Sequence, residues 1–178
     1  MEEIFGNRLT PSEARKSLKA AEGYKKSCPD DADVDYKIRI RKNKSLYDRL
    51  GIMDLRLEGE SEAEFDREKG IVVSNIRMGF GHYRISMAMA SAAKALGYTP
   101  YWLDLNSFPK TAATKIITKQ NNLYSLGSRL SKNPVFNKLI WEPVNYTGFK
   151  KLTYNASDLE TSKLMAPLYQ DIPKEIPV

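Results

Sequence analysis

The chain has 178 residues, 28 of them Lys or Arg and 22 Asp or Glu, which gives a formal net charge of +6. A chain of this length can bury one core of ordinary size, so we expect one domain with an appendage. Cys28 is the single cysteine, which excludes an internal disulfide and fits a reducing compartment. The acidic start has no apolar segment after it, and no apolar run is long enough to span a bilayer, so we expect a cytoplasmic protein.

The first helix has a strong start signal. The stretch Thr10-Pro11-Ser12-Glu13 predicts Thr10 as the N-cap, Pro11 in the first turn and Glu13 as the partner in a capping box. The apolar stripe of the helix is narrow and built largely from small side chains. We therefore expect a peripheral helix that rests on another element and ends between residues 27 and 31.

Two alternating segments follow, and both predict strands. In residues 35–43, Tyr36, Ile38 and Ile40 alternate with Lys and Arg, and residues 52–57 alternate in a similar way. A short helix is expected between them at residues 45–50, and the two strands should pair antiparallel beside the main sheet. The basic face of the first strand suits nucleic-acid phosphates, but alternating cations are also typical of a protected edge strand, so we expect no nucleic-acid partner.

Residues 58–69 are dense in acidic side chains, with six carboxylates in the run. A metal site needs ligands that converge from more than one element, so this run indicates a solvated connector and no metal is expected. We place a boundary after it. Residues 1–69 are expected to form an N-terminal extension, and residues 70–178 the main domain.

Residues 70–105 form the segment around which the rest of the chain is organised. Ile71, Val72 and Val73 predict a strand buried on both faces. A glycine-containing turn follows, then an amphipathic helix over residues 81–96 that Gly97 ends. A second strand is expected over residues 99–105, so the order is that of one β-α-β unit in an α/β protein. The apolar stripe of the helix consists of Ile85, Ala88, Met89, Ala92 and Leu96.

The turn between the first strand and this helix is the candidate site. Gly79 and Gly81 flank Phe80 there, and glycine permits a tight turn and the close approach of backbone to a ligand. The start of a helix supplies unpaired N–H groups and a positive dipole end. Arg77 and Arg84 lie on either side, so the turn predicts an anion-binding site.

His82 lies at the expected start of the helix, either as a general base or as a structural residue bonded to a neighbouring carbonyl. The stretch Gly79-Phe80-Gly81-His82, placed after a strand and opening an Ala/Met-rich helix, resembles the first loop of GT-B glycosyltransferases. It is most similar to the mono-glycosyl-diacylglycerol synthases, with the peptidoglycan lipid N-acetylglucosaminyltransferase further off.

The resemblance implies a Rossmann-like parallel sheet, the acceptor-side N-terminal domain of a GT-B enzyme, with the helix and strand pair of residues 1–69 added. It implies that His82 deprotonates the acceptor hydroxyl, that the turn residues and arginines named above bind the acceptor or an anion, and that no cofactor is needed. The substrates would be a nucleotide-sugar and a lipid-type acceptor. The chain departs from the family pattern at Phe80 and at Arg77-Met78. Because a GT-B enzyme has two such domains, we expect this chain to be the front part of a longer protein and inactive by itself.

Asp104 offers a further alternative. It lies 25 residues after Gly79, near the place where a dinucleotide-binding fold has the acid that binds ribose, so an NAD-dependent enzyme is also considered. The glycine fingerprint fails at its third position, where Arg84 stands. A bulky cation there hinders the close packing of helix on strand.

Residues 110–151 hold eight cations and one acid, interleaved with large apolar side chains. We expect two or three amphipathic helices, with breaks near Asn133-Pro134 and Pro143. Such helices attach peripherally to the inner face of an anionic membrane, or they cover the sheet with their cations facing water. A non-catalytic membrane-surface or interaction module is therefore the alternative to the transferase.

The end of the chain predicts one more helix and the approach to a third strand. The helix is expected over residues 156–169, packed on the sheet, and the approach to the strand over residues 171–178. The buried face of the helix should consist of Leu159, Leu164, Met165 and Leu168.

Overall fold

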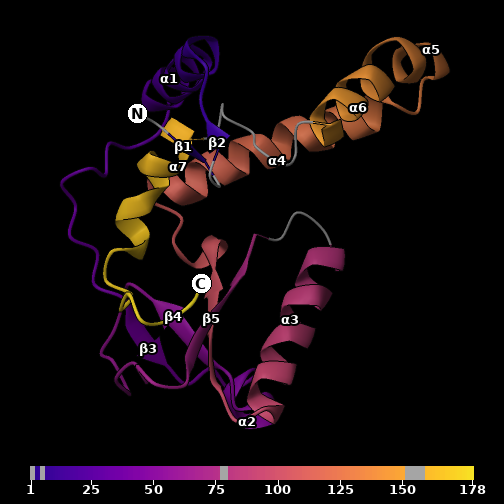
Figure 1. Cartoon of the computed structure of the whole chain (residues 1–178). Helices are drawn as coiled ribbons and strands as arrows, with labels where there is room; N and C mark the ends of the chain where they lie inside the picture. The colour runs from indigo at the N-terminus through magenta and orange to yellow at the C-terminus, as the bar shows by residue number, and fades with distance from the viewer. Residues whose placement is uncertain (1–2, 5–6, 77–79, 151–158) are drawn as a thin grey trace.

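A mixed four-stranded sheet lies at the centre of this α/β protein, and a long helical arm extends to one side (Figure 1). The computed structural model describes residues 3–4, 7–76, 80–150 and 159–178. Its strands are β1 (Glu3–Ile4), β2 (Asn7–Arg8), β3 (Arg39–Arg41), β4 (Met53–Arg56), β5 (Gly70–Asn75) and β6 (Thr99–Asp104). Its helices are α1 (Pro11–Lys25), α2 (Tyr47–Leu50), α3 (Phe80–Ala95), the 3-10 helix η1 (Leu105–Ser107), α4 (Ala112–Leu130), α5 (Pro134–Phe136), the π-helix η2 (Asn137–Trp141), α6 (Glu142–Lys150), α7 (Leu159–Met165) and the 3-10 helix η4 (Ala166–Tyr169).

The sheet has the strand order β3-β4-β6-β5. β5 and β6 pair in parallel and α3 connects them, which confirms the expected β-α-β unit. β3 and β4 form the expected antiparallel pair. β4 also pairs in parallel with β6, where Asp54 lies beside Trp102. The strand pair from residues 1–69 therefore belongs to the same sheet as the segment that begins at residue 70.

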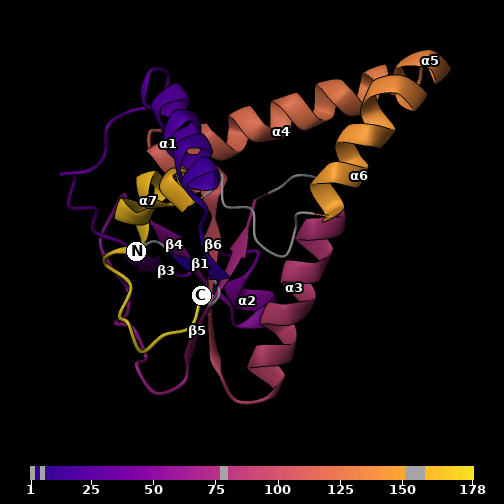
Figure 2. The same ribbon diagram turned by 45° about the horizontal axis from the view of Figure 1, so that its top comes forward.

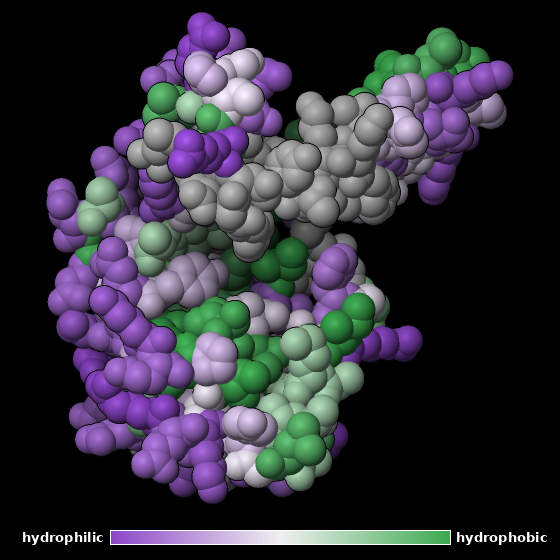
Figure 3. Space-filling model, in the orientation of Figure 1, coloured by the Kyte–Doolittle hydropathy of each residue, from purple (hydrophilic) through white to green (hydrophobic). Residues whose placement is uncertain are grey.

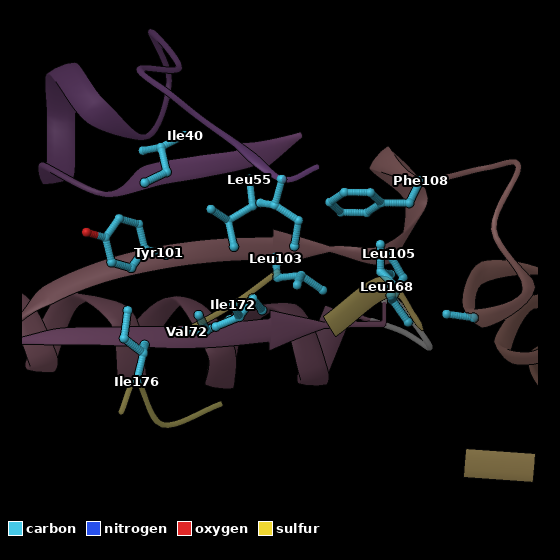
Figure 4. Close-up of a cluster of buried hydrophobic side chains, with 12 residues drawn as sticks. Ile40, Leu55, Val72, Tyr101, Leu103, Leu105, Phe108, Leu168, Ile172 and Ile176 are labelled. Carbon is cyan, nitrogen blue, oxygen red and sulfur yellow. The ribbon is translucent and has the colours of Figure 1, made fainter. Parts of the chain in front are cut away.

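Strand alternation divides the core into two clusters, one on each face of the sheet. Val72 belongs to one cluster and Val73 to the other, which confirms that β5 is buried on both faces. The larger cluster is drawn in Figure 4 and consists of Ile38, Ile40, Leu55, Val72, Tyr101, Leu103, Leu105, Phe108, Ala113, Leu168, Ile172 and Ile176. The smaller cluster lies under α3 and consists of Leu46, Ile52, Val73, Ala90 and Trp102.

The face that α3 turns to the sheet differs from the predicted one. Ile85, Met89 and Leu96 are each more than half exposed, whereas Ser86 and Ala90 are buried. The face turned to the sheet packs on the buried Trp102 of β6, with the small Ala90 next to it and the partly buried Tyr83 and Met87 packed against the same cluster. The Ser86 hydroxyl joins this face to the sheet by donating a 3.1 Å hydrogen bond to the Ser74 carbonyl of β5. The apolar stripe of α3 is consequently an exposed surface.

The capping box at the start of α1 is confirmed. The Thr10 Oγ1 accepts a hydrogen bond from the Glu13 N–H, and the Glu13 carboxylate accepts one from the Thr10 N–H at 2.9 Å. α1 rests on α7 as a peripheral helix, with Ser17 and Ala21 buried. The Ser17 hydroxyl accepts a 2.9 Å hydrogen bond from the Glu160 N–H, which fixes the two helices side by side.

The first alternating strand is shorter than expected. Only residues 39–41 pair with β4, which is itself a strand of four residues. Just before β3, the Ile38 N–H donates to the Asp171 carboxylate at 2.8 Å instead of to a neighbouring strand. The alternation still describes burial correctly, since Ile38 and Ile40 are in the core. The free edge of β3 is covered by residues 61–62, where Ser61 Oγ accepts from the Ile40 N–H and the Glu62 N–H donates to the Ile40 carbonyl.

The helices α4 to α6 form a hairpin, called the arm below, that leads away from the sheet in both views (Figures 1 and 2). The predicted break at Asn133 is confirmed, because its side chain caps α5. The predicted break at Pro143 is wrong: the chain stays helical through α5, η2 and α6 and only changes its helix type. Gly127 of α4 lets the Trp141 ring pack against the helix, since a Cβ at Gly127 would lie 2.0 Å from that ring.

The C-terminal segment packs on the sheet side opposite to α3. Residues 156–158 of the expected helix lie outside the described residues, and α7 followed by η4 forms the rest. Leu168 is buried in the larger cluster, and Met165 packs against it. Ile172 and Ile176 continue this contact. The Val72 N–H of β5 donates to the Pro177 carbonyl at 2.8 Å, so the segment expected to approach a third strand lies at the free edge of β5 without forming one.

Candidate functional site

The carboxyl ends of β4, β5 and β6 lie at one edge of the sheet, which is where open α/β sheets bind ligands. Asn75 and Asp104 are register partners at the ends of β5 and β6, and both are buried. The turn from β5 to α3 starts here, as expected. Two of the predicted site residues, Arg77 and Gly79, lie outside the described residues.

The described part of the predicted turn is the first turn of α3. Phe80, Gly81 and His82 are its first three residues, and all are exposed, with Phe80 exposed to 79 %. The guanidinium of Arg84 lies over the Phe80 ring at 5.9 Å from its centroid, which is within the range of a cation–π contact. The structure therefore exposes His82 in the first turn of α3, at the carboxyl end of β5, and places Arg84 over Phe80 at the same helix start.

Asp104, the candidate ribose ligand, has a structural role. Its side chain is 2 % exposed and accepts a 3.0 Å hydrogen bond from the Asn106 N–H, which caps η1. It also lines a small polar cavity of about 80 Å³ beneath the start of α3, together with Asp54, Tyr83 and Trp102. The Asp104 side chain thus lies in the interior beside α3, and its carboxylate accepts a hydrogen bond from the backbone two residues later.

A larger cleft, of about 580 Å³, lies next to this cavity. α3 covers β5 and β6 on its side of the sheet, and the polar half of that face, formed by β3 and β4, stays open. The side chains of Arg41, Asp54 and Arg56 share this half by strand alternation and register. The cleft is lined by Arg41, Lys42, Asn43, Lys44, Asp54, Arg56, Leu57, Glu58, Gly59, Asn106, Ser107 and Pro109.

The floor of this cleft is an ion pair between the buried Asp54 and the partly exposed Arg56. Asp54 is 2 % exposed, and its Oδ2 accepts from both Nε and Nη2 of Arg56, at 2.7 and 2.6 Å. The Asn43 side-chain amide donates to the same Oδ2 at 3.3 Å. The other carboxylate oxygen, Oδ1, is buried and accepts no hydrogen bond from any residue that the structure describes. Breaking such a pair from one side leaves a buried charge, so it fixes both side chains firmly.

A second guanidinium is fixed at the rim. The Nε of Arg41 donates to the Glu62 carboxylate at 2.7 Å. Gly59 lies under the same side chain: its φ is +85°, and a Cβ there would come within 1.9 Å of an Arg41 nitrogen. Only glycine allows this turn to lie so close to the guanidinium. Arg41 and Arg56 are therefore held in place on neighbouring strands.

Sequence reasoning missed this cleft. The cations of residues 37–41 indicated an edge strand, and β3 does lie at the edge of the sheet. The same pattern does not say which other segments of the chain lie across the cleft from these cations. The available signal was the pair Asp54 and Arg56, because residues two apart in a strand share a face. Their register with β3 and their closeness to residues 106–107 depend on the sheet order, which the sequence does not contain.

No group of histidine, cysteine and acidic residues in the described ranges could hold a metal ion. Along the same ranges, no helix has both the length and the apolar composition that crossing a bilayer requires. The acidic run of residues 58–69 makes turns and ion pairs instead: Asp66 caps the turn before β5 and Glu62 binds Arg41.

The chain belongs to a protein family described as a domain of unknown function, DUF6937, whose model matches residues 3–178. No curated protein and no solved structure matches the chain. The family match covers the sheet, the helix start at His82, the cleft over β3 and β4, and the arm. All of these therefore lie within the one domain that the family model describes.

Proposed function

We propose that this chain is the acceptor-side domain of a glycosyltransferase that moves a sugar from a nucleotide-sugar to a lipid-type acceptor. The observation that carries the proposal is the exposed position of His82 in the first turn of α3, at the carboxyl end of β5. A general base must reach a proton of the bound substrate, and this edge is where parallel sheets bind ligands. The acceptor oxygen would form the new bond to the sugar, the bond to the nucleoside diphosphate would break, and the proton would pass to His82.

The surroundings of His82 support a lipid acceptor. His82, Ile85 and Met89 are three and four residues apart, so they lie along one side of α3. Ile85 and Met89 are exposed, and Phe80 adds an exposed ring at the helix start. Exposed large apolar side chains beside a candidate base can contact the acyl chains of an acceptor. Arg84 would bind an anionic group, since a guanidinium suits phosphate or carboxylate.

The finer fold belongs to the same proposal. A Rossmann-like N-terminal domain of a GT-B enzyme contains a strand, a glycine turn, a helix and a parallel strand, and the unit β5-α3-β6 agrees with this order. The parallel pairing of β4 with β6 extends the parallel part of the sheet, as such a domain requires. The nucleotide-sugar would be held mainly by a second domain.

The proposal is tested on the complete protein that contains this chain, with labelled nucleotide-sugars and diacylglycerol acceptors. His82→Ala should lower kcat by about a hundred- to ten-thousand-fold and change the acceptor KM little, which is the usual contribution of a positioned general base. His82→Asn should be nearly as harmful, because an amide cannot take up a proton. Arg84→Ala should instead raise the acceptor KM.

The matched control is Lys19→Ala, which removes an exposed cation from α1. It should leave both kinetic constants unchanged. A His82→Ala enzyme with full turnover would end the assignment of His82 as the base, and His82 would then be a structural residue of the helix start.

The NAD-dependent alternative has less support. Its ribose ligand would be Asp104, whose carboxylate is buried and engaged by the Asn106 N–H. Arg84 occupies the position of the third glycine in the fingerprint. We therefore do not propose a nicotinamide cofactor for this chain.

The arm supports a second candidate function, peripheral attachment to an anionic membrane surface. Apolar side chains of the arm are exposed, and they surround a hollow of about 420 Å³ near its far end. Figure 3 shows hydrophobic and hydrophilic residues side by side at that end. The cations Arg129, Lys132 and Lys138 are exposed close to the hollow in sequence, and Glu142 is the one acid in residues 110–151. This combination fits lipid head groups with negative charge. The exposed large apolar residues are Leu123, Tyr124, Leu126, Leu130, Val135, Leu139, Ile140, Val144 and Tyr146.

A further inference from the structure

We propose that the cleft over β3 and β4 binds a small phosphorylated polyol, such as a sugar phosphate. This site is separate from the helix start at His82, and the proposal does not depend on the glycosyltransferase proposal. Its volume, about 580 Å³, lies within the range typical of small-molecule sites. It also lies where β4 and β6 end, which is the edge used for ligands in open parallel sheets.

The charge of the cleft selects an anion. Its lining contains four cations and two carboxylates. Asp54 is committed to Arg56, and the exposed Glu58 is the other acid. Lys42 and Lys44 are exposed on the loop that follows β3, so they can move toward a bound group. The net positive charge favours a ligand with at least one negative group.

The two arginines make phosphate the best candidate for that group. A guanidinium has five N–H donors in a planar fork, and Asp54 occupies only two of those on Arg56. Glu62 occupies one donor of Arg41. The remaining donors belong to side chains that an ion pair already orients, so less conformational entropy is lost when they bind the oxygens of a phosphate.

The other polar groups indicate that the ligand carries hydroxyls. Asn43, Asn106 and Ser107 supply amide and hydroxyl groups along the cleft. The Oδ1 of Asp54 is a buried carboxylate oxygen to which no described residue donates, and a carboxylate oxygen accepts hydrogen bonds from hydroxyls but repels phosphate. We infer that the phosphate lies toward Arg41 and the lysines, and a hydroxyl toward Asp54.

The test is isothermal titration calorimetry of the whole chain with glucose 6-phosphate, inorganic phosphate and glucose, at moderate salt. Glucose 6-phosphate should bind more tightly than inorganic phosphate, and glucose most weakly. Arg41→Lys keeps the charge and removes the fork, so it should weaken glucose 6-phosphate and inorganic phosphate alike, by about tenfold. Asp54→Asn should weaken glucose 6-phosphate and leave inorganic phosphate unchanged or tighter.

Lys19→Gln is the matched control, because it removes one exposed cation from α1 at the other end of the molecule (Figure 1). It should leave both affinities unchanged. Equal losses in Lys19→Gln and Arg41→Lys, or no saturable binding in the millimolar range, would overturn the site. Because Asp54→Asn changes a buried carboxylate that pairs with Arg56, urea unfolding should accompany it. If it unfolds more easily, Ser107→Ala tests the hydroxyl side instead, and an unchanged preference for glucose 6-phosphate in that variant would refute the polyol part.

Discussion

At the scale of single residues, Asp66 connects the acidic segment to the sheet. Its N–H donates a 2.7 Å hydrogen bond to the Tyr101 hydroxyl in the larger core cluster. Its carboxylate accepts from the Glu68 and Lys69 N–H groups and from the Thr99 hydroxyl. Hydrogen bonds from the Lys69 backbone, and next from Thr99, hold the pKa of Asp66 below its ordinary value of 3.8. Asp66 therefore has a structural role, although it belongs to a run predicted to be a solvated connector.

This lowered pKa gives a pH-dependent stability. Because the pKa of Asp66 is lower in the folded chain than in the unfolded chain, its contribution is fully present above 3.8 and is lost as the pH falls through the folded-state pKa. Asp66→Asn should lower the urea midpoint at neutral pH, and its difference from the wild type should shrink in acid. Glu60→Gln removes an exposed carboxylate from the same run and should have no such effect. A difference between Asp66→Asn and the wild type that is the same at both pH values would contradict this role.

At the scale of elements, the arm depends on one close contact between its two helices. Trp141 packs over Gly127, and its ring lies 5.7 Å from that of Tyr124. The contact joins η2 to α4. Because most described large side chains of the arm are otherwise exposed, we expect this contact to contribute to keeping the hairpin closed.

Gly127→Ala should therefore destabilise the arm although alanine is the better helix former. The new methyl group would meet the Trp141 ring, and such overpacking costs about 1–3 kcal/mol. Gly23→Ala is the control, because Gly23 lies in α1 and a Cβ there meets no described atom within 4 Å. That change should stabilise the chain by about 0.4–1 kcal/mol. Tryptophan fluorescence and circular dichroism during urea unfolding measure the change in the free energy of unfolding for both variants. A Gly127→Ala chain as stable as Gly23→Ala would show that the contact is loose.

Local signals predicted the elements well, and long-range contacts account for the differences. The capping box at Thr10 and the cap at Asn133 involve residues within one turn, so the sequence contains everything needed. The point where β3 begins depends on Asp171, which is 133 residues away from Ile38 in the sequence. The outward face of α3 depends on Trp102 in the next strand, which no periodicity within the helix reveals.

At the scale of the whole molecule, the helix start was predictable and the cleft was not. His82 follows a buried strand and a glycine turn within one β-α-β unit, so its place at the sheet edge follows from chain order. The cleft takes residues from 41–44, 54–59 and 106–109, which meet only through the strand order β3-β4-β6. The polar face of β4 indicates such a site once that order is known.

The arm gives a prediction for the complete chain. The protein should sediment with vesicles that contain an anionic phospholipid. It should be released as the salt concentration rises, because salt screens the attraction between exposed cations and the lipid head groups. Arg129→Glu with Lys132→Glu should weaken the binding, and Lys19→Glu on α1 should not. Equal binding to neutral and anionic vesicles at every salt concentration would contradict the electrostatic part, and no binding to either would refute attachment.

The bonds at the two edges of the sheet have a consequence for behaviour in concentrated solution. The Ile40 backbone is occupied by residues 61–62 on one side, and the Val72 N–H by the Pro177 carbonyl on the other. Open strand edges are the usual template for fibrillar aggregation, and proline cannot donate the hydrogen bond that would continue a ladder. At these positions the sheet offers no template for the backbone of a second molecule.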